Sequence, residues 1–283
     1  MKAEARHLEP IQPLREENSP DPDIFLSVVI PAFHEQDRID DTLSAVKDYL
    51  QIQEFNSEIM VVDGGNYDRT TEIIKSLGRY IYDFKEQRST MVARSIRNLG
   101  QGFSLARSIL KARGKYILCT DEDLSTPISE IEKLWPHVRN GTDIVLTFPK
   151  SRTVQMSRSL KGKCVEYAVR AIARLMAIRG IQYRQCTFKL LDQDSAKSIA
   201  RAQKIYNSSF DIEQLYLAHA LGFSIKEVPV EWRPPERNKV SSPNDPVRLL
   251  LDIFEILYVH RGVKRSGRLD QRGTTEDDGT ACT

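Results

Sequence analysis

The stretch Lys115-Tyr116-Ile117-Leu118-Cys119-Thr120-Asp121-Glu122-Asp123-Leu124-Ser125-Thr126-Pro127 decides the fold. Its apolar run is short, which favours a buried strand, and acidic residues follow directly. A strand that ends in carboxylates carries charge at the carboxyl edge of a sheet, where open α/β folds bind ligands. Asp121 and Asp123 are one residue apart and can reach one point beyond the strand. Such oxygen ligands suit Mg²⁺ or Mn²⁺ shared with a substrate's phosphates.

A second interpretation of this stretch is the acidic start of a helix. Ser125 or Thr126 would be the N-cap, and Pro127 would take the first helical position. The acidic residues before them would then be favoured by the helix dipole. An Asp-x-Asp pair alone does not decide between a metal site and a helix start, so the surrounding pattern must.

The surrounding chain alternates short apolar runs with segments of helical periodicity. This alternation predicts an α/β fold with a mainly parallel sheet and helices on both faces. The expected strands are 25–30, 59–62, 80–82, 116–119, 144–147, 185–191 and 224–230. The expected helices are 39–50, 70–77, a segment near 105–110, 128–138, 164–178, 195–203, 212–221 and 247–260. Residues 83–97 are basic and show no clear periodicity.

Composition is that of an ordinary globular protein, with 40% apolar and 28% charged residues in 283. A net charge of +2 gives no reason to expect a nucleic-acid partner. The four cysteines lack the spacing of a zinc site, and no apolar run approaches the ~18 residues that span a bilayer. We therefore expect a cytoplasmic location, either soluble or peripheral at a membrane. The expected organisation is a mobile arm at 1–23, one domain at 24–262 with halves at 24–150 and 151–262, and a disordered tail at 263–283.

Seven motifs in order resemble glycosyltransferase family 2 with the GT-A fold, most closely its dolichyl- or polyprenyl-phosphate glucosyl- and mannosyltransferases. The likeness covers roughly residues 25–262. It is carried by SVVIPAFHE at 27–35, VVDGGNYDRT at 61–70, NLGQG at 98–102, ARGKY at 112–116, DEDLSTP at 121–127, QCTFKL at 185–190 and FDIE at 210–213.

The resemblance implies an inverting transfer of a hexose from a nucleoside-diphosphate sugar, UDP-glucose being favoured, to a polyprenyl or dolichyl phosphate. Asp121 and Asp123 would hold Mg²⁺ or Mn²⁺ on the donor diphosphate, with Arg233 and Lys239 closing over it. The implied donor-binding residues are Pro31, Phe33, Glu35, Val62, Asp63 and Glu122, and the implied acceptor-binding residues are Arg152 and Arg158. Each of the four basic residues has the alternative of a solvated loop charge, and Phe33 and Val62 that of simple packing.

Three departures from the family pattern bear on this prediction. Gly64 replaces an aspartate that meets the base in relatives, Thr187 replaces a glycine, and Tyr183 stands where many relatives carry an aspartate suggested as catalytic. A hydroxyl acceptor would need such a base, but a phosphate monoester with a second pKa of ~6 is already largely ionised. Tyr183 therefore favours a lipid-phosphate acceptor over a sugar hydroxyl; alternatively, Asp211 or Glu213 could serve as the base instead.

The segment 247–268 bears on how a lipid acceptor would be reached. It combines an apolar stripe with Arg261, Lys264, Arg265 and Arg268, so it could lie on an anionic membrane, or it could pack in the core with a solvated basic end. Two other functions stay open. One is the same fold acting on a soluble metabolite, a polysaccharide or a natural-product acceptor, and the other is a noncatalytic nucleotide-sugar-binding protein.

Overall fold

The computed structural model of the protein describes residues 24–32, 39–63, 91–94, 101–121, 123–150, 187–207, 209–233 and 246–263. The expected arm at 1–23, helix 70–77, strand 80–82 and helix 164–178 lie outside these residues, as does nearly all of the expected tail. The proposed division of the domain at residue 150 stays a prediction.

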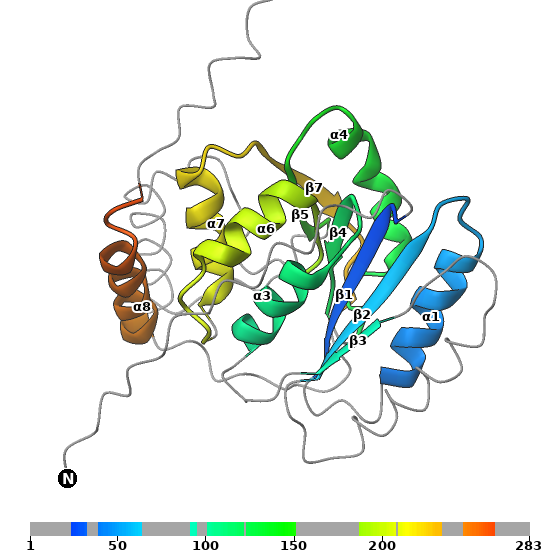
Figure 1. The fold of residues 1–283 in the computed structure, drawn as a ribbon, viewed down its shortest axis with the longest axis horizontal. Helices are drawn as coiled ribbons and strands as arrows, with labels where there is room; N and C mark the ends of the chain where they lie inside the picture. The colour runs from blue at the N-terminus through cyan, green and yellow to red at the C-terminus, as the bar shows by residue number, and fades with distance from the viewer. Residues whose placement is uncertain are drawn as a thin grey trace, which may run out of the picture.

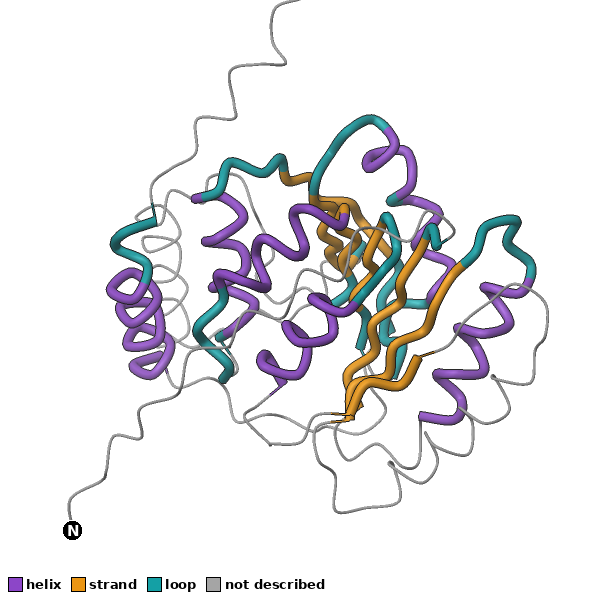
Figure 2. The backbone as a smooth tube through the Cα atoms, in the orientation of Figure 1, coloured by secondary structure: helices purple, strands orange, loops and turns teal. Residues whose placement is uncertain are grey.

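Seven strands of the described residues form one sheet in the order β3-β2-β1-β4-β6-β5-β7. Figures 1 and 2 show how this sheet lies among the helices. Neighbouring strands are parallel except where β6 runs antiparallel to both β4 and β5. The mainly parallel sheet expected from the sequence is therefore confirmed. The strands are β1 (Leu26–Ala32), β2 (Ser57–Asp63), β3 (Met91–Arg94), β4 (Tyr116–Cys119), β5 (Ile144–Pro149), β6 (Lys189–Asp192) and β7 (Ile225–Val230).

Helices cover both faces of the sheet (Figure 1). They are α1 (Ile39–Gln51), α3 (Gln101–Lys111), the 3₁₀ helix η1 (Ile128–Lys133), α4 (Trp135–Arg139), α6 (Gln193–Ala202), α7 (Phe210–Ala220) and α8 (Pro246–Val259). Alternate residues of β1 supply the two cores: Val28 and Ile30 pack with α1, η1 and α4, whereas Val29 packs with α3, α6 and α7. α8 forms an outer layer against α7.

Three elements differ from the sequence-based expectation for physical reasons. β1 continues through Pro31. β4 ends opposite Val29, and beyond that point β1 pairs only with β2. The missing N–H of Pro31 therefore interrupts no hydrogen bond to β4. The helix expected at 128–138 is instead η1 followed by α4, and Pro136 lies in the first turn of α4. The segment without periodicity contains β3, a four-residue edge strand that is too short to show alternation.

Candidate functional site

The carboxyl ends of β1, β2 and β4 meet at one edge of the sheet, because these three neighbours are parallel. In the register, Ala32 lies opposite Asp63, and the amide of Thr120 donates to the Val29 carbonyl at 3.1 Å. The backbones of Pro31 and Asp63 and the residue after Thr120, Asp121, therefore lie at the same edge. This is the edge at which open α/β sheets bind ligands.

A tight turn follows β4 and fixes the position of Asp123. Its Oδ1 accepts hydrogen bonds from the Ser125 amide at 3.1 Å and from the Ser125 hydroxyl at 2.7 Å. Between them, Leu124 has a φ of 47°, in the left-handed region that a leucine rarely adopts. Such strained positions cluster at functional sites, where the surrounding structure holds them in place.

The helix-start interpretation of this turn is wrong for the residues it named. The N-cap position of η1 is Pro127, and no side chain caps that helix. Ser125 instead uses its hydroxyl and amide to orient the carboxylate of Asp123. The acidic residues therefore belong to a built turn at the sheet edge.

Asp121 is a carboxylate under electrostatic strain. Burial, followed by the neighbouring charge of Asp123, raises the pKa of Asp121 from the usual 3.8 to about 6. Hydrogen bonds from the hydroxyls of Thr120, at 3.4 Å to Oδ1, and Thr187, at 3.2 Å to Oδ2, act in the opposite direction. A bound hard cation beside Asp121 would offset both the burial and the neighbouring negative charge, so this arrangement suits a cation site.

Thr187 is a site residue that reasoning from motifs treated only as a departure from the family pattern. It immediately precedes the buried Phe188, and the antiparallel register places the next residue, Lys189, opposite Cys119 at the end of β4. Thr187 therefore faces the acidic turn, and its hydroxyl reaches Asp121. The signal that could have revealed it is the antiparallel pairing of β6, which cannot be read from a single sequence.

Arg233 lies beside the acidic turn through its backbone. Its amide donates to the carbonyl of Ser125 at 2.8 Å, and the amide of Glu231 donates to Glu130 Oε2 at 3.0 Å. Glu130 also forms an ion pair with Lys133 at 2.5 Å. These contacts anchor the segment after β7 to η1 and to the turn, so the exposed Arg233 is available close to the predicted diphosphate site.

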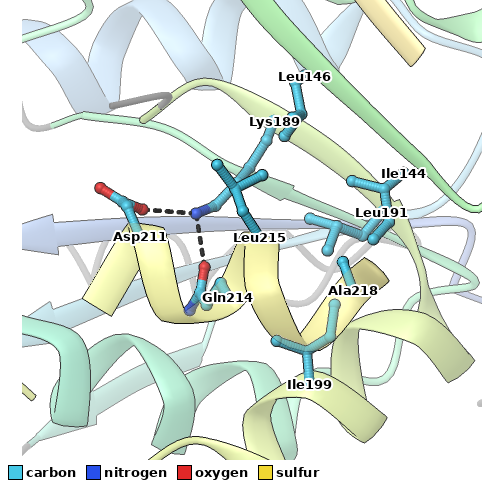
Figure 3. A pocket seen from close by; sticks show the side chains of 9 residues that line it. All are labelled: Ile144, Leu146, Lys189, Leu191, Ile199, Asp211, Gln214, Leu215 and Ala218. Atoms are coloured by element: carbon cyan, nitrogen blue, oxygen red, sulfur yellow. Dashed lines mark hydrogen bonds and ion pairs between the residues drawn. The ribbon is translucent and has the colours of Figure 1, made fainter. Parts of the chain in front are cut away.

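Asp211 belongs to a buried polar network around Lys189 of β6 (Figure 3). Lys189 donates to Asp211 Oδ1 at 2.8 Å and to Gln214 Oε1 at 2.6 Å, and Gln214 in turn donates to Gln203 at 2.8 Å. A buried ammonium needs such partners, so one oxygen of Asp211 is engaged structurally. Its role as a base stays a prediction.

Glu213, the other replacement base considered, is fully buried. Its two oxygens accept from the amides of Lys204 and Ile205 at 2.8 and 2.9 Å, and His260 contacts it at 2.6 Å. This carboxylate joins three segments of the chain and faces no open space in which a substrate could meet it.

The remaining predicted residues can be placed only in part. Val62 pairs with Pro31 in the ladder between β1 and β2, but the side chains of Val62 and Asp63 lie outside the described part of the chain. Phe33, Glu35, Glu122, Arg152, Arg158, Lys239, Gly64 and Tyr183 also lie outside it. Within the described residues, no group of three or more histidine, cysteine, aspartate or glutamate side chains is placed to hold a metal.

Comparison with known proteins shows which family the chain matches. The family model described as Glycosyl transferase family 2 matches residues 27–201. A dolichyl-phosphate beta-glucosyltransferase of Dictyostelium discoideum is 28% identical over 87% of this chain and 77% of its own length. The protein of the same name from Saccharomyces cerevisiae is also 28% identical, over 85% of this chain and 76% of its own.

Solved structures resemble this one in fold. Glucosyl-3-phosphoglycerate synthase of Mycobacterium tuberculosis, crystallised with Mn²⁺, uridine diphosphate and phosphoglyceric acid, superposes with a TM-score of 0.58 at 18% identity, over 86% of this chain and 81% of that one. Mannosyl-3-phosphoglycerate synthase from Rubrobacter xylanophilus gives 0.58 at 14% identity, over 89% and 78%. At these identities the likeness concerns the arrangement of strands and helices alone.

Proposed function

Since the chain belongs to glycosyl transferase family 2 and is a glycosyltransferase of GT-A fold, we propose that it transfers glucose from UDP-glucose to dolichyl or polyprenyl phosphate. The choice of sugar and acceptor is supported by the names of its relatives, which span most of this chain. The observation that carries the reaction type is the pair of half-buried carboxylates, Asp121 and Asp123, at the carboxyl edge of the sheet.

We propose that this pair holds Mg²⁺ or Mn²⁺ together with the donor diphosphate. When bound there, the cation neutralises charge that develops on the departing diphosphate. The residues fit the ion, because Asp121 is half-buried beside a like charge and Asp123 is oriented by two hydrogen bonds from Ser125. Glu122, which stands between the two aspartates in the sequence, is proposed to contact the donor.

The remaining donor contacts are proposed around this pair. The edge formed by Pro31, Val62 and Asp63 would face the nucleotide, with Phe33 and Glu35 in the segment that follows β1. Arg233, anchored beside Ser125, and Lys239 would lie on the diphosphate and stabilise its charge. Arg152 and Arg158 follow β5, and they would bind the acceptor phosphate.

The proposed chemistry needs no protein base. A phosphate oxygen of the acceptor attacks the anomeric carbon from the face opposite the diphosphate, and its lone pair forms the new C–O bond. The bond from that carbon to the diphosphate oxygen breaks, and its electron pair leaves with uridine diphosphate, so the configuration inverts. Because the attacking phosphate is largely ionised at neutral pH, no proton has to be removed. Asp211 is hydrogen-bonded to Lys189, and Glu213 is in contact with His260. These contacts agree with a reaction in which neither carboxylate acts as a base.

A lipid acceptor requires access to a membrane. No helix within the described residues is both long and apolar enough to cross a bilayer. We propose that the protein acts from the cytoplasmic face of a membrane, with the segment 247–268 as its peripheral contact.

The test is a transfer assay with a panel of nucleotide sugars, in Mn²⁺ or Mg²⁺, with and without a short-chain polyprenyl phosphate. The proposal predicts a glucolipid from UDP-glucose and none without the acceptor. Sugar release without a lipid product would instead support a soluble acceptor. Absence of both nucleotide binding and turnover would support the noncatalytic alternative, with Gly64 and Tyr183 as the first residues to examine.

A further inference from the structure

Helix α8 carries apolar residues on two opposite sides. On its inner side, Ile253 and Ile256 are buried in a cluster with Ile205. On its outer side, Leu251, Phe254 and Tyr258 are 63%, 64% and 66% exposed. Five large apolar side chains are exposed in the part of the chain that the structure describes, and these three lie together on one helix. Single exposed apolar residues are ordinary, but a contiguous row marks a surface of interaction.

Buried polar contacts fix which side of α8 faces outward. The Ser209 hydroxyl donates to Asp252 Oδ2 at 2.5 Å, and Nε2 of His260 lies 2.6 Å from Glu213 Oε1. All four residues are buried. Because such pairs lose their partners if the helix rotates, they hold the outer row toward solvent instead of letting it turn inward.

The row begins close to the edge of the sheet that carries the candidate site. Lys189 lies opposite Cys119 at the end of β4, and its ammonium bonds Asp211 in the first turn of α7. Ser209, the partner of Asp252, directly precedes α7. The half of α8 that contains Asp252 and Leu251 therefore lies toward the same edge, on the outermost layer of that side of the molecule (Figure 1).

Positive charge adjoins the row at its carboxyl end. The exposed Arg261 places its guanidinium carbon 4.8 Å from the ring centre of Tyr258. Over residues 261–268 the sequence has four cations and no acid, although the placement of 264–268 lies outside the described residues. Glu255 is an exposed acid on the same helix, and in the sequence the four cations of 261–268 outnumber it. An apolar and aromatic row bordered by cations matches an anionic bilayer surface better than it matches a neutral protein partner.

We propose that the outer face of α8, formed by Leu251, Phe254 and Tyr258, rests on an anionic lipid surface, with Arg261 among the head groups. This assignment rests on the proposed function, because the contact would bring the sheet edge close to the phosphate of a lipid acceptor in the bilayer. It deepens that function by assigning three exposed side chains and one cation to the contact.

The full-length chain is to be sedimented with vesicles of phosphatidylcholine alone and of phosphatidylcholine with phosphatidylserine. The test variant is Leu251→Ser/Phe254→Ser/Tyr258→Ser. The matched control is Ile52→Ser, which removes a side chain that is 78% exposed just after α1, across the sheet from α8. We expect the triple variant to lose about 10-fold or more in partitioning to the anionic vesicles, and Ile52→Ser to lose nothing. Arg261→Glu should weaken binding to the anionic vesicles alone.

Equal binding by the triple variant and the wild type would overturn the proposal. The proposal would also be overturned if light scattering without lipid showed a dimer for the wild type and a monomer for the triple variant. The outer face of α8 would then join two copies of the chain. Failure of the proposed function is recognised separately. The triple variant should keep wild-type transfer to a short-chain polyprenyl phosphate in solution and lose it with a vesicle-embedded acceptor. No transfer by the wild type to either acceptor would reject the function and leave the vesicle-binding result standing.

Discussion

Replacing Asp121 by asparagine should make the metal-free protein more stable at neutral and alkaline pH. Asparagine has nearly the same shape and still accepts a hydrogen bond, but it carries no charge into the buried site. In the folded protein, burial and the charge of Asp123 raise the pKa of Asp121 from 3.8 to about 6. The ionised carboxylate therefore opposes folding, and the substitution removes that opposition.

The sign and size follow from linkage. A folded-state pKa above the unfolded value gives stability that is fully present below pH ~3.8 and is lost as the pH rises through about 6. One pKa unit corresponds to about 1.36 kcal/mol, so the difference between 3.8 and about 6 corresponds to at most about 3 kcal/mol of unfolding free energy. Asp121→Asn should therefore match the wild type near pH 3.5 and exceed it by up to about 3 kcal/mol at pH 8.

The assay is urea denaturation in a chelator at both pH values, with Asp48→Asn on the exposed side of α1 as the control. Mn²⁺ at 100 times its Kd should nearly cancel this difference at pH 8, because a ligand at that concentration stabilises the wild type by about 2.7 kcal/mol and should stabilise the variant little. The electrostatic account of this site would be refuted if Asp121→Asn were no more stable than the wild type at pH 8. It would also be refuted if the gain in stability at pH 3.5 were as large as the gain at pH 8.

Three further substitutions test other parts of the structure. Thr187→Val removes a hydroxyl that lowers the pKa of Asp121, so the acidic limb of the pH–activity profile should move to higher pH, whereas Thr187→Ser should leave it in place. Lys189→Met leaves the buried Asp211 without its ion-pair partner and should lower the free energy of unfolding in urea by about 3–5 kcal/mol. The double variant Lys189→Met/Asp211→Asn should recover part of this loss, and a loss below about 1 kcal/mol for Lys189→Met would argue against the ion pair. Gly114→Ala would place a methyl group 2.5 Å from a backbone nitrogen of β1, and we expect a loss of about 1–3 kcal/mol in thermal or urea unfolding, with unchanged stability contradicting that close approach.

Much of the sheet could be predicted because its strands leave a local signature. The runs that became β1, β2, β4 and β5 are short, apolar and followed by turn residues or charge, and each was found to within three residues at either end. β3 could not be predicted in this way, because four residues at a sheet edge show too little alternation. The split of η1 from α4 depends on Pro136 within an otherwise helical stripe.

The candidate site could be predicted only where its chemistry is contiguous in sequence. Asp121 and Asp123 follow one strand, so their proximity needs no knowledge of tertiary structure. The hydrogen bond from Thr187 depends on the antiparallel register of β6, and the approach of Arg233 depends on a backbone contact across 108 positions. The exposed side of α8 is a third case, because a two-sided apolar helix does not reveal from its sequence which side the fold covers.

The most direct test of the central claim compares the wild type with Asp123→Ala in transfer from UDP-glucose to a short-chain polyprenyl phosphate, over a titration of Mn²⁺. Circular dichroism should first show that the variant is folded. The account predicts a metal-dependent glucolipid product for the wild type and a fall of about 100-fold or more for the variant. Full activity in Asp123→Ala, or transfer by the wild type that is indifferent to metal removal, would contradict the assignment of the acidic turn as the diphosphate–metal site.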